Sequence, residues 1–522
     1  MARPSGPPVA RSAVRPDLVL GFAAVAATAT VGTWAGRTAF PLLTDEAGYL
    51  ADACNLVSFA SLAWGPFYAA LYCALRHVSD DPFGVFWAKQ AAVPLAAGAL
   101  FDRLGLAYGL GPLLSPLAAL WCVLALLVVN GTNEFAILLG LTACLWAASG
   151  GRRGWMGFGV LMGAASLVRP EYLVGLGAAA MLPLGRRCGR RCVAAVAAVL
   201  TLAAVLAVAR KSGGEARSWF AFGQQFAVNY VEARGAGPDP NVEWRSVVAQ
   251  SFPSSASISE AVRENPRMVA WHLRYNLSRR LPRALANLLV PVPSFVLWPF
   301  PLREALATTV LVLVLVAAAA GARKPARVRG PSLTPLLALA TLPSVSLLFR
   351  PAARHLEPLL PLVVVLVGTA LKTESDEAPS GLRTGGRWLF AGALLLGLAS
   401  PWAFWARTPA PSPALTEWIR GLRLDARSRP VRLLGTWYAD RTCALVGPSC
   451  RVVSIAEFLG GHEVDAAVIG PDWDARADVR SDPRLRGLPS RPEDYDCVAS
   501  AAPADGFRFI RCGPAGRRGP RL

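Results

Sequence analysis

Long apolar runs alternate with shorter polar segments over most of the chain. A helix that crosses a membrane needs roughly 17 to 25 apolar residues. Runs of that kind are predicted at 18–39, 84–101, 107–129, 192–209, 305–321, 332–348, 356–371 and 388–405, with another that ends at 151–154. The run 155–184 is interrupted by Arg169-Pro170-Glu171 and predicts two short helices, because proline disfavours helix in the residue before it and starts a new one readily. The pattern therefore predicts about eleven membrane helices.

Two polar segments are too long to be ordinary turns. The segment 40–83 follows the first apolar run, and 210–303 far exceeds common connection lengths, which is typical of a functional or ordered region. Within it, the apolar stretch 284–301 carries four prolines. This composition favours an interfacial or re-entrant piece over a spanning helix.

The C-terminal region, 406–522, has a different pattern. Short strand-like runs such as VRLLGTWYA, RVVSIAEF, DAAVIG and FRFIRC are separated by turn residues. That alternation predicts a small soluble α/β domain after the membrane helices.

Composition supports the membrane interpretation. Of 522 residues, 54% are hydrophobic and only 17% are charged, too few charges to cover a globular protein of this length. The net charge of +19 comes from basic clusters between apolar runs, and no basic-aromatic module points to nucleic acid. The basic start runs into an apolar stretch too long for a signal peptide, so we expect residues 1–17 to remain as a basic tail.

Basic clusters also predict orientation. Cytoplasmic loops of membrane proteins are rich in Lys and Arg, as are GRRG, GRRCGRR and ARKPARVR in this chain. This bias places the N-terminus inside and the segments 40–83, 210–303 and 406–522 outside. High Ala, Arg, Gly and Pro usage is typical of a GC-rich bacterial genome, which indicates a bacterial inner membrane.

Four of the ten cysteines lie in the C-terminal region. They are Cys443, Cys450, Cys497 and Cys512, and an oxidising compartment allows them to pair in any of three connectivities. Their spacing does not match that of zinc ligands. We therefore interpret them as candidate disulfide cysteines.

The predicted topology gathers five polar clusters on the outer membrane face. They are Asp45-Glu46, Asn133-Glu134, Arg169-Pro170-Glu171, the loop after Ala209, and Arg350 to Glu357. Ionisable residues at the ends of spans pair with one another or line a polar cavity. Several cations with acids on one face indicate an anionic ligand with chemistry beside it.

Each cluster has a simpler interpretation. Asp45 and Glu46 could only end a span, Glu134 could stabilise the first turn of a helix, and Arg169 could neutralise Glu171. Arg350, Arg354 and His355 could be interfacial side chains that extend toward water.

Several motifs resemble one family. DEAGYL, WGPFYAALY, NEFAILLGLTACLWA, GVLMGAASLVRPEYL and RPAARHLEPLLPLVVVL are similar in order and spacing to landmarks of the GT-C polytopic glycosyltransferases. The resemblance covers about residues 18–371 and favours the family 39, or protein mannosyltransferase-like, branch, which includes aminoarabinose transferases. It implies a GT-C-like membrane domain over 18–405.

The resemblance implies transfer of a sugar from a polyprenyl-phosphate donor to a lipid, glycan or protein acceptor outside the membrane, with inversion in a single displacement. Asp45 is then the catalytic base, and Glu46 orients the acceptor or, in metal-using relatives, joins Asp45 in a divalent-cation site. Arg350, Arg354 and His355 bind the donor phosphate, and a cavity is formed with Tyr49, Glu134, Arg169 and Glu171. The segment ARHLEP departs from relatives, which more often have an aromatic residue where His355 stands.

Two other classes of function stay open. A transporter or flippase for a lipid-linked sugar would use a similar cationic cavity, but it favours internal repeats and charges near the bilayer midplane, which this sequence lacks. A non-catalytic membrane scaffold would use the C-terminal domain to bind partners.

Overall fold

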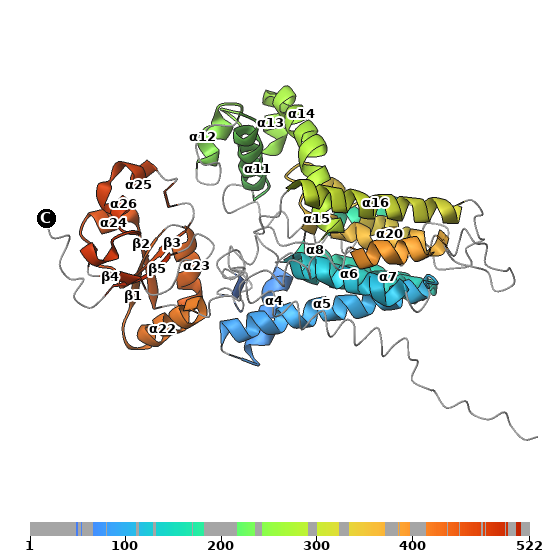
Figure 1. Ribbon diagram of the computed structural model, residues 1–522, viewed down its shortest axis with the longest axis horizontal. Helices are drawn as coiled ribbons and strands as arrows, with labels where there is room; N and C mark the ends of the chain where they lie inside the picture. The colour runs from blue at the N-terminus through green and yellow to red at the C-terminus, as the bar shows by residue number, and fades with distance from the viewer. Residues whose placement is uncertain are drawn as a thin grey trace, which may run out of the picture.

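The computed structural model describes residues 49–50, 54, 66–79, 81–110, 114–128, 132–169, 171–181, 217–234, 243–290, 300–322, 333–370, 385, 387–396, 414–435, 437–447, 449–470, 473–474, 477–495, 497–499 and 508–512. The apolar runs 18–39 and 192–209 lie outside these ranges. Figure 1 shows a bundle of long helices and a separate sheet domain, with α11 to α14 at the end of the bundle that faces the sheet. The count of eleven membrane helices stays a prediction.

The first half of the bundle is a series of helices joined by short connections. They are α4 (Pro66–Arg76), α5 (Pro82–Ala107), α6 (Leu114–Val128), α7 (Thr132–Ala148), α8 (Gly151–Val168) and α9 (Tyr172–Met181). Helix α5 packs against α6 and α7, and α7 packs against α8. Because short connections join antiparallel neighbours, the break between α8 and α9 lies at the same end of the bundle as the start of α5.

Local chemistry explains where these helices begin. The Asp81 carboxylate accepts from the backbone N–H groups of Phe83 and Gly84 at 3.3 Å each, and Pro82 occupies the first turn, so α5 starts there. Between α7 and α8, Gly150 and Gly151 have φ of 77° and 69°, which glycine adopts without steric cost. The chain can therefore reverse sharply at that point.

The second half of the bundle returns across the first. It contains α16 (Phe300–Ala322), α17 (Thr334–Ala340), α18 (Pro343–Ser346), α19 (Ala353–Leu356), the 3-10 turn η4 (Glu357–Leu359) and α20 (Leu360–Ala370). The single run expected at 332–348 is two short helices, because Pro343 has no N–H to continue α17 and favours the start of a new helix. Among the described helices, none combines the length and the hydropathy required to cross a membrane.

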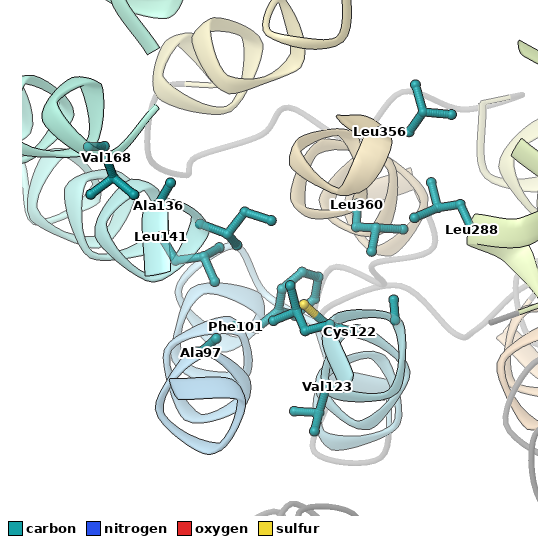
Figure 2. Packing of buried hydrophobic residues seen from close by; sticks show 14 of the residues in the cluster. Ala97, Phe101, Cys122, Val123, Ala136, Leu141, Val168, Leu288, Leu356 and Leu360 are labelled. Atoms are coloured by element: carbon teal, nitrogen blue, oxygen red, sulfur yellow. The ribbon is translucent and has the colours of Figure 1, made fainter. Parts of the chain in front are cut away.

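One hydrophobic core joins the two halves. Figure 2 shows Phe101 and Cys122 facing Leu360, with Leu288 beside Leu356. All five side chains are buried. Leu356 therefore anchors the end of α19 in the core, directly after the polar residues 350–355.

The polar segment 210–303 contains a helical subdomain. Its elements are α11 (Arg217–Arg234), α12 (Trp244–Ala249), α13 (Ile258–Glu264), α14 (Pro266–Tyr275), the π-helix η3 (Asn276–Arg280) and α15 (Leu281–Leu289). A small aromatic core holds it together, with Phe222, Phe226 and Phe252 in contact at ring-centroid distances of 5.0 to 6.1 Å. The segment is thus ordered by its own packing, and α15 covers part of the stretch that sequence assigned to an interfacial piece.

The C-terminal region forms an α/β domain. Its elements are α22 (Ala414–Ser428), β1 (Val431–Gly435), α23 (Trp437–Val446), β2 (Cys450–Val453), α24 (Ile455–Leu459), β3 (Ala466–Ile469), α25 (Ala477–Ser481), α26 (Pro483–Gly487), η5 (Pro492–Tyr495), β4 (Cys497–Ala499) and β5 (Arg508–Cys512). The strand order is β2-β1-β3-β5-β4, with β1 parallel to β2 and β3, and β5 antiparallel to β3 and β4. Val431 pairs with Cys450 and Leu433 with Ala466.

Two expected strands are shorter than their apolar runs. In VRLLGTWYA the strand ends at Gly435, where an added Cβ would lie 2.7 Å from the Val468 carbonyl oxygen and 2.8 Å from the Ala439 Cβ, so α23 packs closely over the strand end. In RVVSIAEF, Ser454 and Glu457 form a capping box that begins α24. Local capping and packing therefore override the strand-like run.

Asp81 also joins the bundle to the sheet domain. Besides capping α5, its carboxylate lies 3.1 Å from Arg420 Nη2 and 3.6 Å from Arg423 Nη1, both on α22. The Arg420 guanidinium additionally lies over the Phe83 ring, 5.6 Å from its centroid. The start of α5 and α22, the first helix of the sheet domain, are thus joined by two ion pairs and a cation–π contact.

Candidate functional site

The polar stretch between α18 and α20 is held at both ends. We call residues 350–355 the arginine segment. On one side the Phe349 N–H donates to the Ser346 carbonyl at 3.1 Å, and on the other Leu356 is buried in the core. Arg354 is exposed, whereas Arg350 and His355 are half-buried. The segment therefore presents its cations from a fixed backbone.

His355 is neutral in this setting. Its Nδ1 lies 3.1 Å from the Arg350 carbonyl oxygen, which can only accept, so Nδ1 carries the hydrogen and Nε2 is an acceptor. Burial lowers the pKa of His355 well below its usual value, and the charges of Arg354 and Arg169 lower it further. The ring therefore adds no positive charge for a phosphate, and its geometry favours a role in holding the Arg350 backbone.

Arg169 and Glu171 lie at the break between α8 and α9. The Arg169 Nε is 3.2 Å from the Glu171 Oε1, so the two charges partly neutralise each other, as the simpler interpretation of the sequence allowed. The Arg169 charge nevertheless acts on His355. The break at 169–171 and the arginine segment are therefore neighbours in the folded chain, although about 180 positions separate them in sequence.

Further cations come from the helical subdomain. Arg280 of η3 and Arg283 of α15 both bind the Glu232 carboxylate, Arg283 at 2.8 Å, and Arg280 is almost fully buried. This carboxylate has a lowered pKa because it accepts from Arg283 and lies beside Arg280, which outweighs its burial. One glutamate thus serves two arginines.

These arginines and those of the arginine segment act on one another. Burial, and after it the charges of Arg280, Arg354 and Arg283, lower the pKa of Arg350 to about 10, while the charge of Glu232 opposes them. A lowered guanidinium pKa means that the cation is less favourable there than in water. The neighbourhood therefore has a surplus of positive charge that a bound anion would relieve.

Tyr49, the cavity residue expected from sequence, belongs to a buried aromatic cluster. Its ring meets Tyr68 edge to face at 4.8 Å, and Tyr68 meets Tyr72 at 5.2 Å. The Lys89 Nζ donates to the Tyr68 hydroxyl at 3.1 Å and lies over the Phe86 ring. Lys89 is only 1% exposed.

Sequence reasoning missed Lys89. The signal was present, because a lone lysine within an otherwise apolar run is costly and usually functional or specifically paired. It was overlooked because it does not lie in a polar loop. The structure places this cation two side chains away from Tyr49, through Tyr68.

Several expected site residues cannot be placed. Asp45 and Glu46 lie outside the described residues, although Tyr49 and Leu50 that follow them are helical and buried. Glu134 lies in the first turn of α7, and its side chain is likewise outside the description. Within the described ranges, no three His, Cys, Asp or Glu side chains are grouped as a metal site would require.

The cysteines fall into two groups. Cys443 pairs with Cys450 and Cys497 with Cys512, one of the three connectivities that sequence left open. A third disulfide, Cys54–Cys73, ties the segment after the predicted catalytic acids to α4. In the part of the chain that the structure describes, the free cysteines are Cys122 and Cys144, both buried in the bundle.

Comparison with known proteins gives little. No protein-family model matches the chain, and no curated protein matches its sequence. Among solved structures, it is similar to the apo form of the oligosaccharyltransferase of Archaeoglobus fulgidus, with 11% sequence identity, a TM-score of 0.44, and coverage of 88% of this chain and 70% of that one. A likeness of this size does not establish a common fold.

Proposed function

We propose that the chain is a membrane glycosyltransferase of the GT-C type. It moves a sugar from a polyprenyl-phosphate donor to an acceptor on the extracytoplasmic side, with inversion at the sugar carbon. The observation that carries this proposal is the electrostatic neighbourhood of Arg350, on which the charges of Arg280, Arg283 and Arg354 act together while Glu232 opposes them.

A phosphate fits this neighbourhood by charge and geometry. When the sugar leaves, the polyprenyl phosphate takes a full additional negative charge, and fixed cations stabilise it as the bond breaks. Arginine suits this task because its planar fork can bind two phosphate oxygens and keeps its charge. In the proposed site Arg350 and Arg354 bind the phosphate, while Arg280 and Arg283, both bound to Glu232, add positive charge nearby.

Asp45 is the proposed base. Its carboxylate takes the proton from the acceptor hydroxyl, the hydroxyl oxygen bonds to the anomeric carbon, and the bond from that carbon to the phosphate oxygen breaks. Glu46 orients the acceptor, or joins Asp45 in a divalent-cation site. Support comes from Tyr49, whose burial against Tyr68 fixes the chain just beyond these acids.

The disulfides support the proposed side of the membrane. The three disulfides among the described residues fall in segments that sequence assigns to the outside, 40–83 and 406–522. The free cysteines Cys122 and Cys144 fall in runs assigned to the membrane. Disulfides persist in oxidising compartments, which agrees with an extracytoplasmic catalytic face.

The first experiment identifies the donor and acceptor. Membrane lipids and surface glycans are compared by mass spectrometry with and without the gene, and loss of the enzyme should let a polyprenyl-phosphate sugar accumulate while one glycan or lipid loses that sugar. Unchanged levels of both would overturn the donor assignment. If the protein were a flippase or a scaffold, the purified protein would not release polyprenyl phosphate from the donor, although a flippase would still bind it.

The second experiment tests the base. Asp45→Asn, restored to the deletion strain, should lower transfer by about a thousandfold, because a positioned general base contributes that much and the amide cannot take the proton. The variant should keep its thermal unfolding midpoint and bind donor. Transfer at the wild-type rate would show that Asp45 is not the base.

A further inference from the structure

A buried set of polar side chains lies between the helical subdomain and the arginine segment. It comprises Asn229 of α11, His272 of α14, and Asn276 and Arg280 of η3, and we call it the amide network. All four are buried, with exposed fractions of 0, 0, 0 and 6%. Burying so many polar groups is costly unless each finds a partner.

Hydrogen bonds join all four side chains of the network. The Asn229 amide donates to the Asn276 Oδ1 at 2.8 Å and to the His272 Nδ1 at 3.2 Å, while the Asn229 Oδ1 accepts from the Arg280 Nε at 2.8 Å. With Nδ1 as acceptor, the His272 Nε2 carries the hydrogen and donates to the Phe349 carbonyl at 3.0 Å. The network thereby selects one tautomer of His272.

The remaining donors leave the subdomain. Both hydrogens of the Asn276 amide go to backbone carbonyls, that of Leu347 at 2.9 Å and that of Phe349 at 2.8 Å. With the bond from His272, three hydrogen bonds therefore end on the Leu347 and Phe349 carbonyls, just before Arg350. A network that only stabilised the subdomain would have no need to end on a distant segment of chain.

The π-helix explains how three side chains spaced four residues apart, His272, Asn276 and Arg280, join one network. In a regular α-helix, residues i and i+4 are offset by about 40° around the axis, so His272, Asn276 and Arg280 would drift apart. In η3 the Leu281 N–H donates to the Asn276 carbonyl, five residues back, and this wider turn reverses the drift. Such turns often occur at functional sites.

We infer that His272 and Asn276 are positioning residues that fix the backbone before Arg350 and thereby aim its guanidinium at the anionic ligand. The ligand part of this inference rests on the proposed function, while the backbone part does not. Arg280 links the amide network to the charges around Arg350. It bonds to the network through Nε and to Glu232 through Nη2, and its charge acts on Arg350.

The backbone part is tested by hydrogen–deuterium exchange on the full-length protein in lipid nanodiscs. Asn276→Asp replaces two donors by acceptors at nearly constant shape, so amide exchange over 347–355 should rise about tenfold or more. Asn265→Asp is the matched control, because Asn265 also donates to a carbonyl, that of Ser251 at 3.2 Å, but has no contact with the arginine segment among the described bonds. Unchanged exchange over 347–355 in Asn276→Asp, or an equal rise in the control, would overturn the inference.

A milder change guards against misfolding. Asn276→Ala removes the same donors without adding a charge, and it should raise exchange over the same residues. If both Asn276 variants fold and leave 347–355 as protected as in the wild type, the positioning role is refuted.

The ligand part is tested by a double-mutant cycle with farnesyl phosphate as the probe, measured by calorimetry. Asn276→Asp should weaken binding about tenfold in the wild-type background and cause no further loss when Arg350→Ala is already present, because it acts through Arg350. Additive losses would contradict that route. If the wild-type protein does not bind farnesyl phosphate, the proposed donor class fails, and the exchange experiment still decides the positioning role.

Discussion

The amide network and the arginine segment meet at Phe349 and Arg350, but their polar groups are arranged in opposite ways. In the network the Asn229 and Asn276 amides both donate to acceptors, and His272 is bonded through both ring nitrogens. In the arginine segment, burial and the charges of neighbouring arginines lower the pKa of both Arg350 and His355. Under the proposed function, the network holds the segment in place and the segment binds the anion.

The largest expected effect is a loss of folding stability at low pH, which arises in the amide network. Burial lowers the pKa of His272 to about 4 from 6.5, so the unfolded chain binds a proton that the folded chain refuses between these values. The stabilising contribution is complete above about pH 6.5 and is lost as the pH falls toward 4, by about 3 kcal/mol. Thermal unfolding midpoints measured between pH 7.5 and 4.5 should show this slope.

Two variants isolate His272 in that titration. His272→Gln keeps a donor for the Phe349 carbonyl but cannot be protonated, so its midpoint should depend less on pH than the wild type does. His462→Gln, at an exposed histidine, is the control and should follow the wild type. An identical pH slope in His272→Gln and the wild type would mean that the balance around this ring does not govern stability.

A smaller effect breaks the unbalanced region. Arg354→Ala should weaken farnesyl phosphate binding by about 2 kcal/mol, roughly thirtyfold, because it removes a charge-assisted contact. Its unfolding midpoint should not fall, because the substitution removes a cation from a cluster already rich in them. Calorimetry and thermal melts together check both expectations. Arg480→Ala, an exposed arginine on α25, provides the charge-matched control.

The binding loss in Arg354→Ala should also shrink as salt rises, because part of it is electrostatic. Unchanged affinity at low salt would remove Arg354 from the phosphate site. A large loss of stability would instead place it with the supporting residues.

The smallest expected effect is on the free energy of unfolding, and it concerns a third set of charges, around Asp81. Asp81 binds Arg420 and Arg423 in a partly exposed position between the bundle and the sheet domain. Asp81→Asn keeps the cap on α5 and removes only the charge, so the free energy of unfolding should fall by about 0.5 kcal/mol. Asp81→Ala loses the cap as well and should cost about 1 kcal/mol more. Chemical denaturation measures both, and equal losses in the two variants would show that charge, rather than capping, dominates.

Sequence alone predicted much of the secondary structure around the site. The break at Arg169-Pro170-Glu171 was expected because proline interrupts an apolar run, and α8 ends and α9 begins on either side of it. The α/β character of the C-terminal region followed from alternating short runs, although capping at Ser454 and close packing at Gly435 shortened the strands. These features depend on neighbours in sequence.

The support of the site could not be predicted in the same way. Asn229 is joined to Phe349 through Asn276, and these three residues come from separate parts of the chain. Single asparagines in a polar segment carry no periodic signal. The neutral state of His355 depends on burial and on arginines brought there by folding. The sequence predicted Arg350 and Arg354 as cations at the site, but not the arrangement that holds them.

The mutual hydrogen bonding of the amide network has a consequence for how related sequences can vary. Each of Asn229, His272 and Asn276 supplies the one partner that another lacks, so a single replacement leaves a donor or an acceptor stranded in the interior. Descendant sequences should therefore keep the set whole or exchange several members together.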